Sequence, residues 1–64
     1  MQRIALNLRR LRNARALTQA DVAKKAGLSR EYLSRIEGGR QDPTVGTLEK
    51  IAKALKVTVV DLVK

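Results

Sequence analysis

Neither cysteine nor histidine occurs among the 64 residues of this sequence. The lack of cysteine excludes disulfides and thiolate metal sites, and the lack of histidine removes the commonest metal ligand and acid–base catalyst at neutral pH. No apolar run is long enough to cross a membrane, and the arginine-rich start does not fit a signal peptide. We therefore expect a cytoplasmic protein without a metal, a cofactor, a membrane partner or a small-molecule ligand.

Aromatic side chains are almost absent, since Tyr32 is the only one. Proteins that bind single-stranded nucleic acid stack bases on aromatic rings, so this composition disfavours that class. An enzyme is disfavoured too, because no carboxylates are placed to share a proton and the serines have no evident base. A chain of this length also has little room for a substrate cavity. We predict that the protein is not an enzyme.

Positive charge is what the sequence has in excess. Fourteen Lys and Arg residues against six Asp and Glu residues give a net charge of +8. Five of the arginines fall in residues 1–15, which contain no acidic residue. Such a charge favours polyanions, either nucleic acid or an anionic membrane surface. The membrane-surface alternative is weaker, because the basic N-terminal segment has no Trp or Phe.

Apolar residues recur with helical spacing along the whole chain, which predicts an all-α domain. We expect a first helix over residues 3–15 and four more that follow the N-cap residues Thr18, Ser29, Thr44 and Thr58. The first and last of these caps are followed three residues later by Asp, which is the spacing of a capping box. No linker or repeat interrupts the pattern, so we expect one domain over residues 1–64.

The apolar positions also predict the core. The expected stripe of the fourth helix consists of Val45, Leu48, Ile51, Ala52 and Leu55. The C-terminal helix is expected to turn three residues inward: Val59, Leu62 and Val63. The side chains expected to close the space between the second and third helices are Val22, Ala26, Leu28, Leu33 and Ile36.

A single glycine separates the second and third helices in the segment KKAGLSRE. Two short helices joined by about three residues, with Gly at the joint, form a helix-turn-helix. We expect Gly27 to adopt a positive φ, which a Cβ atom disfavours. Ala23, four residues earlier, would supply the small side chain needed where the helices cross. Spacing alone also fits an ordinary helical hairpin.

The segment that begins at Thr18, TQADVAKKAGLSREYLSRIEGGRQDPTVGTLEKIAKALKVTVVDL, resembles the Cro/C1-type (XRE) helix-turn-helix family of lambdoid phage repressors and bacterial transcriptional regulators. The resemblance covers roughly residues 4–63, with the motif at about 19–38. It implies a compact five-helix, lambda-repressor-like domain with the helix-turn-helix at its second and third helices. It also implies a regulator of transcription that reads duplex DNA as a homodimer. We expect this regulator to be a repressor that occludes polymerase, with activation through a surface contact as the alternative.

In this geometry the third helix lies in the major groove with its N-terminal residues facing base edges. Leu33 and Ile36 should point into the core, so the opposite face carries the expected base contacts: Arg30, Glu31, Ser34 and Arg35. Arg30 can make two hydrogen bonds to a guanine, while Glu31 can accept one from cytosine or simply favour the helix N-terminus. The resemblance assigns Arg35 to DNA, without deciding between a base and a phosphate.

The residues expected to contact the DNA backbone are Gln19, Ser29, Tyr32, Arg40, Gln41 and Thr44. The loop after the third helix and the start of the fourth should face phosphates, because a helix N-terminus offers free N–H groups. The resemblance implies that Gln19 contacts phosphate and supports the third helix. Tyr32 can instead fill a gap beside the second helix, and Arg40 can instead be a solvated loop residue.

The resemblance further implies an internal ion pair between Arg12 and Glu37, which makes both residues structural like Ala23 and Gly27. Val60 and Leu6 are apolar at positions that should be exposed, and we predict that Val60 lies at a homodimer interface. Two copies would then read a pseudo-palindromic operator, with half-sites about 10 bp apart, at the nucleoid. The alternative is an antitoxin-like or coactivator module of the same fold whose main partner is a protein.

Overall fold

The computed structural model of the protein describes residues 2–64, with side chains from residue 3 onward. Its helices are α1 (Gln2–Ala14), α2 (Gln19–Ala26), α3 (Arg30–Glu37), α4 (Val45–Leu55) and α5 (Val59–Val63). No strand occurs in this range, so the prediction of an all-α fold with five helices is confirmed. None of these helices combines the length and the apolar character that a membrane crossing would require within residues 2–64.

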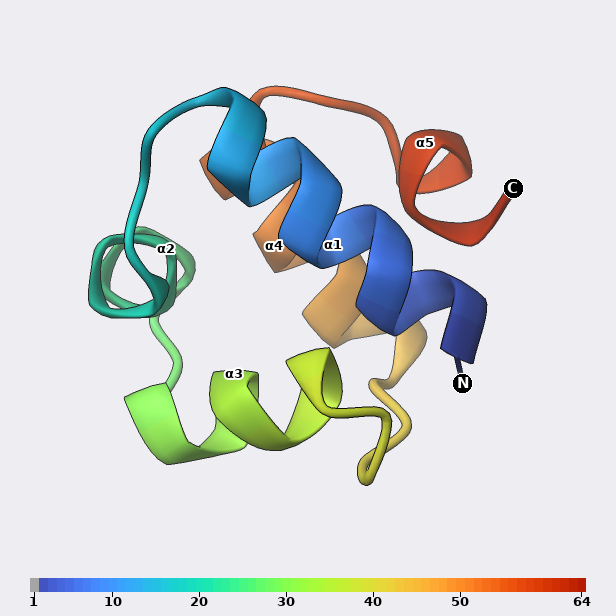
Figure 1. The fold of residues 1–64 in the computed structure, drawn as a ribbon, viewed down its shortest axis with the longest axis horizontal. Coiled ribbons are helices and arrows are strands. Elements are labelled where there is room, and N and C mark those ends of the chain that lie inside the picture. Colours follow the sequence, from blue (N-terminus) through green and yellow to red (C-terminus); the bar gives the residue numbers. More distant parts are fainter. Residues whose placement is uncertain (1) are drawn as a thin grey trace.

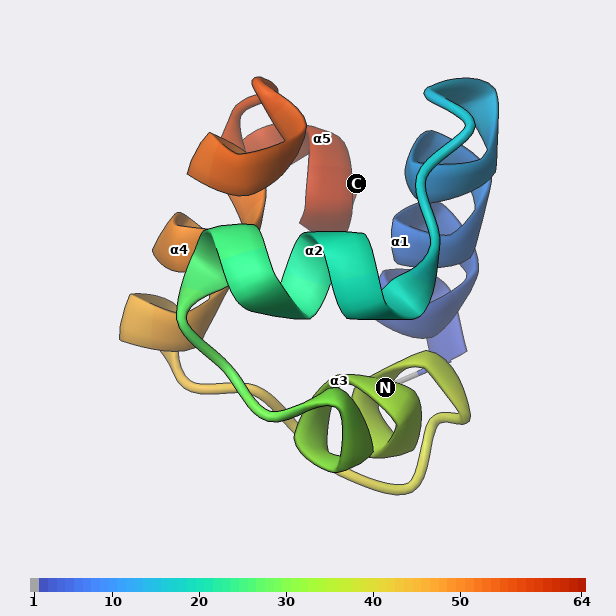
Figure 2. The same ribbon diagram turned by 90° about the vertical axis from the view of Figure 1, so that its left-hand side faces the viewer.

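The helices enclose one core, and α3 lies at one end of it (Figures 1 and 2). In Figure 2, α2 lies between α4 and α1, with α3 below it and α5 at the opposite end. α2 packs on α3 and α4, while α1 packs on α3 and α5. This arrangement leaves α3 with one face against α1 and α2 and the other face toward solvent.

Local hydrogen bonds begin four of the helices as the sequence predicts. A side-chain hydroxyl accepts from the backbone N–H three residues later at each expected N-cap: Thr18, Ser29, Thr44 and Thr58. Both predicted capping boxes are present, with Asp21 accepting from the Thr18 N–H and Asp61 from the Thr58 N–H. The pKa of each aspartate lies below its ordinary value, mainly because of the hydrogen bond from the threonine backbone and, to a lesser extent, because of the one from the threonine side chain.

The core contains most of the residues that helical spacing assigns to it. Its buried apolar side chains are Ile4, Ala5, Leu8, Val22, Ala23, Ala26, Leu33, Ile36, Leu48, Ile51, Ala52, Leu55 and Leu62. Two expectations are wrong, because Val45 is 69% exposed and Val63 is 39% exposed. Val45 is the first residue of α4, where a side chain leans toward the N-terminus and past the core. Val63 ends a five-residue helix that buries only Leu62.

The turn between α2 and α3 has the predicted conformation. Gly27 adopts φ 71° and ψ 31°, in the left-handed region. This conformation lets the next residue, Leu28, donate its N–H to the Ala23 carbonyl at 2.8 Å and close the end of α2. Ala23 itself is buried in the core. The chain can therefore leave α2 and begin α3 at Arg30 with very few intervening residues.

A buried carboxylate fixes the other end of α3. Glu37 is 2% exposed, and its two oxygens accept from Arg12 Nε at 2.8 Å and Arg12 Nη2 at 3.0 Å. Gln19 Nε2 donates to the same carboxylate at 3.1 Å, and Arg12 Nη1 donates to the Leu17 carbonyl at 2.9 Å. The expected ion pair is thus present, and it ties α3 to both α1 and the start of α2. Among the described residues, no buried side-chain nitrogen or oxygen lacks a hydrogen-bond partner.

The glycine turn gives a testable prediction with an internal control. Gly27→Ala should lower the free energy of unfolding by about 1 kcal/mol through backbone strain alone, since a Cβ there would meet no atom within 4 Å. Gly46→Ala should raise the free energy of unfolding by up to about 1 kcal/mol, because this position in α4 has room for a Cβ and Ala has the higher helix propensity. Urea denaturation of both variants measures the difference. Equal effects of the two substitutions would contradict the role of Gly27.

Removal of the buried carboxylate should lower the free energy of unfolding far more than removal of an exposed one. Glu37→Ala leaves the Arg12 guanidinium, only 15% exposed, without its counter-ion, so we expect a loss of about 3 kcal/mol of unfolding free energy. The exposed Glu49→Ala should change it by less than about 0.5 kcal/mol. Thermal and urea unfolding measure both. A loss at Glu37 no larger than at Glu49 would show that the pair does not hold α3.

Candidate nucleic-acid interface

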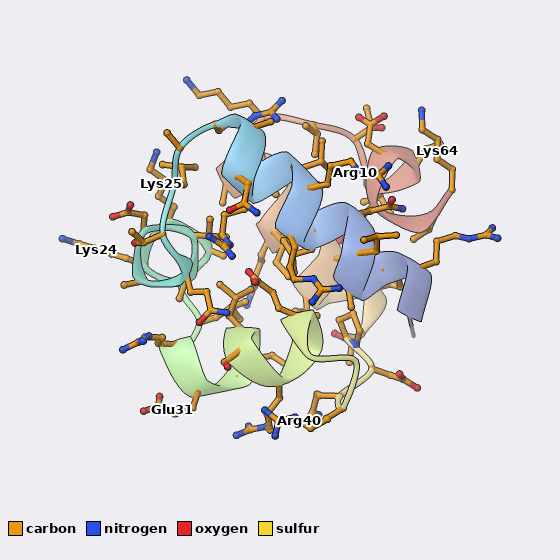
Figure 3. The ribbon with its side chains drawn as sticks, in the orientation of Figure 1. Arg10, Lys24, Lys25, Glu31, Arg40 and Lys64 are labelled. Atoms are coloured by element: carbon orange, nitrogen blue, oxygen red, sulfur yellow. The ribbon has the colours of Figure 1, made fainter. Side chains whose placement is uncertain are left out.

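The outer face of α3 brings the predicted base contacts together. Leu33, Ile36 and Glu37 are buried on the inner face, while Arg30, Glu31 and Arg35 are exposed. The four predicted base contacts line one shallow, open hollow of about 440 Å³ together with two predicted backbone contacts: Arg30, Glu31, Ser34, Arg35, Gln19 and Arg40. Figure 3 shows Glu31 and Arg40 pointing outward at this end of the molecule. Residues up to 21 positions apart thus form one surface.

The charge of this hollow suits a polyanion. Three of its lining residues are arginines and one, Glu31, is acidic. Positive charge is not confined to this face, however. A second hollow of about 380 Å³, between α2 and α4, is lined by four lysines and two alanines: Lys25, Lys50, Lys53, Lys56, Ala26 and Ala54. Charge alone therefore does not identify the interface, and the grouping of hydrogen-bonding side chains around α3 does.

Gln19 has a role on both sides of α3. Its amide nitrogen donates to Glu37 inside the molecule, which agrees with the expected support of the third helix. The same side chain lines the outer hollow beside Arg30 and Ser34. An amide offers two N–H donors and an oxygen, so one contact with Glu37 leaves groups for a second partner. The expected contact of Gln19 with a phosphate stays a prediction.

Arg35 is held by two neighbours. Its Nε donates to Gln41 Oε1 at 3.2 Å, and its guanidinium carbon lies 6.0 Å from the centre of the Tyr32 ring. Arg30 differs, since its side chain forms no hydrogen bond or ion pair with any described residue. Of these two arginines, Arg35 thus contacts neighbouring side chains and Arg30 does not.

Tyr32 is half-buried and packs against the core. Its hydroxyl lies 3.4 Å from the Thr47 hydroxyl of α4, which in turn lies 3.0 Å from the Thr44 hydroxyl. The ring thus packs within the fold and its hydroxyl joins α3 to the start of α4, whereas the alternative expectation placed the ring beside the second helix. A DNA contact by Tyr32 stays a prediction.

Three of the other predicted backbone contacts are exposed at helix starts or in a loop. Ser29 and Thr44 are exposed N-caps whose oxygens accept backbone N–H groups. The Ser29 hydroxyl hydrogen can still be donated, while the Thr44 hydroxyl is also hydrogen-bonded to that of Thr47. Arg40 is exposed in the loop after α3, where its N–H donates to the Arg35 carbonyl at 3.0 Å. Gly38 accommodates this side chain, because a Cβ there would come within 3.3 Å of Arg40 Nε.

Sequence reasoning missed two contacts that shape this surface. It did not single out Thr47, although this residue follows the N-cap Thr44 by three positions and could have been noticed by that spacing. It assigned Gln41 only to the DNA backbone, since nothing local links a loop residue to Arg35. The described part of the chain contains no group of three or more acidic residues placed to hold a metal ion.

Comparison with known proteins identifies the family. The model of a family described as helix-turn-helix matches residues 8–62. An uncharacterized HTH-type transcriptional regulator of Sinorhizobium fredii, y4dJ, is 47% identical over 60 residues, which are 94% of this chain and 78% of that protein. The immunity repressor of Bacillus phage phi105 is 43% identical over 88% of this chain, but the match covers only 39% of the repressor.

Solved structures agree with the sequence relatives. The N-terminal DNA-binding domain of SinR from Bacillus subtilis superimposes with a TM-score of 0.93 at 31% identity, covering 100% of this chain and 94% of that domain. The five helices, the glycine turn and the buried ion pair are thus accompanied by similarity in both sequence and structure. The chain belongs to the Cro/C1-type (XRE) helix-turn-helix family.

Proposed function

We propose that this protein is a sequence-specific, double-stranded DNA-binding regulator of transcription, and specifically a repressor that reads its operator as a homodimer. The observation that carries this proposal is the outer face of α3. Its four hydrogen-bonding side chains lie together over one hollow, while its inner face is fixed to the core. A helix presented in this way fits the major groove of duplex DNA.

Base contacts and backbone contacts would come from different parts of this surface. Arg30, the first residue of α3, can donate two hydrogen bonds to O6 and N7 of guanine, and Glu31 can accept one from N4 of cytosine. The loop residue Arg40, the cap Thr44 and the first N–H groups of α4 would contact phosphates on one side of the groove. Phosphate contacts fix the register, and base contacts select the sequence.

Repression follows from the position of the bound protein. Relatives include a phage immunity repressor and HTH-type transcriptional regulators, which supports a regulatory role for this chain. A protein seated on an operator at a promoter excludes polymerase from the same DNA, and no further chemistry is needed. As such a regulator the protein would act in the cytoplasm, at the nucleoid.

Exposed apolar residues on α1 and α5 support the proposed dimer. Val60 is 61% exposed, and Leu6 and Val63 are 47% and 39% exposed. α5 packs against α1, so these side chains belong to two adjoining helices (Figure 1). Burial of such residues against a second copy would remove apolar surface from water. α5 lies at the opposite end of the core from α3 (Figure 2), so an interface centred on Val60 would leave both recognition helices available.

Selection of bound duplexes from random DNA at about 0.15 M salt tests the function directly. We expect enrichment of an inverted repeat whose half-sites lie about 10 bp apart. Arg30→Ala should then relax the preference at one base pair per half-site by about 1–3 kcal/mol. Lys53→Ala removes the same charge from the second hollow and should leave all base preferences unchanged.

Absence of any enriched sequence would show that the charge supports only non-specific binding, and the protein-partner alternative would then lead. An equal loss on operator and random DNA for Arg30→Ala would remove this residue from the base contacts.

The dimer is tested separately by Val60→Asp, which places a charge in the proposed interface. We expect this variant to sediment as a monomer at concentrations where the wild type is a dimer. Val45→Asp is the matched control, because this valine is 69% exposed at the far end of α4 from α5. Sedimentation velocity measures both variants. An unchanged dimer for Val60→Asp would place the interface elsewhere.

A further inference from the structure

Gln41 lies in the loop between α3 and α4, outside the recognition helix, and its side chain contacts Arg35. We propose that Gln41 determines sequence preference without touching a base, because it fixes the guanidinium of Arg35 in position to read a guanine. This inference rests on the proposed function. It assigns Arg35 to a base rather than to a phosphate, and it makes Gln41 a positioning residue.

The hydrogen bond decides which donors of Arg35 remain available. Arginine has five N–H donors and no acceptor, and here its Nε–H is donated to Gln41 Oε1 at 3.2 Å. The two terminal nitrogens are left, and they form the end of the guanidinium that can donate to O6 and N7 of the same guanine. A phosphate requires no such orientation, since it accepts from many directions.

Both neighbours of Arg35 are themselves tied to the fold. The loop that carries Gln41 is closed onto α3 by hydrogen bonds from the Gly39 N–H to Ile36 and from the Arg40 N–H to Arg35, at 3.1 and 3.0 Å. Gln41 is half-buried rather than free in solvent. On the other side of Arg35, the Tyr32 ring is joined to α4 through its hydroxyl contact with Thr47 at 3.4 Å.

Pre-orientation matters because a long, exposed side chain loses rotational freedom when it binds. A guanidinium that is already held in place loses less, so more of its hydrogen bonding appears as affinity for the correct base. Arg30, which has no such partner among the described residues, has to be ordered by the DNA. We therefore expect base discrimination by Arg35 to depend on its neighbouring side chains. Base discrimination by Arg30 should not depend on such neighbours.

The amide of Gln41 can serve two purposes at once. Arg35 can only donate, so the oxygen of the amide must face it and the NH₂ group must point elsewhere. That group can donate to a DNA phosphate, the role first expected for Gln41. One side chain would then link a phosphate contact to the placement of a base-reading group, and each function resides on a different atom.

Two substitutions separate the role of the Gln41 amide oxygen from that of its NH₂ group. Gln41→Lys keeps a donor for phosphate but removes the acceptor, so binding to random duplex should be kept or increased. The preference for guanine at the Arg35 position should then fall by about fivefold or more. Gln41→Glu keeps the acceptor but removes the NH₂ group and adds a negative charge. Binding to every sequence should weaken, while the guanine preference should stay within about twofold of wild type.

Competition binding against a panel of singly substituted operators measures these preferences. Arg35→Ala first identifies the base pair concerned, as the one whose preference disappears. Arg40→Ala is the matched control in the same loop. It should weaken binding to all sequences alike and reduce the slope of log affinity against log salt concentration by about one. Circular dichroism checks that each variant is folded.

Three results would overturn the inference while the proposed function stands. They are a uniform change across all sequences for Gln41→Lys, a loss of guanine preference in Gln41→Glu as large as in Gln41→Lys, and no change of base preference in Arg35→Ala. Failure of the wild-type protein to select any operator is a different outcome. It would overturn the proposed function itself, and this inference with it.

Discussion

The buried carboxylate of Glu37 is the interaction on which the arrangement of this protein depends. A charge removed from water is strongly unfavourable unless it is paired and its hydrogen bonds are made. Here the partners come from two other helices, Arg12 on α1 and Gln19 on α2. In the observed orientation the three helices satisfy this carboxylate together. That orientation decides which face of α3 is buried and which face is presented.

The candidate interface is therefore built mainly on α3 and the start of α2, with Arg40 added from the loop after α3. Recognition sites require side chains held close to their productive geometry by a second layer of contacts. In this protein Gln19 belongs both to the surface and to the layer that supports it, because it lines the hollow and also donates a hydrogen bond to the buried Glu37. Tyr32 has a similar double position, with its ring beside Arg35 and its hydroxyl against α4. The candidate interface and the core are thus one connected structure.

Local signals made most of the fold predictable from the sequence. The capping boxes at Thr18 and Thr58 and the positive φ of Gly27 depend on residues within a few positions of each other. The errors at Val45 and Val63 arose because helical spacing does not say where a helix extends beyond the core. The family resemblance implied the pairing of Arg12 with Glu37, which spacing alone does not reveal.

For the site, the sequence indicated which residues share the outer face of α3 but not how they are held. The contacts of Arg35 with Gln41 and of Tyr32 with Thr47 join side chains of different segments, and their formation depends on the path of the loop between α3 and α4. The roles of these residues on DNA are still predictions, because they depend on a partner that the sequence does not contain.

The hydroxyl caps also bear on how the chain folds. Each of the four caps and its backbone partner are three residues apart, so the starts of α2, α3, α4 and α5 can form before the chain has collapsed. Domains dominated by such near-neighbour contacts reach their native state quickly. The bond between Arg12 and Glu37 spans 25 residues and can close only after α1 and α3 have met. The surface proposed to read DNA therefore takes its final orientation only when α1 and α3 pack together, whereas the caps that begin its helices need only neighbouring residues.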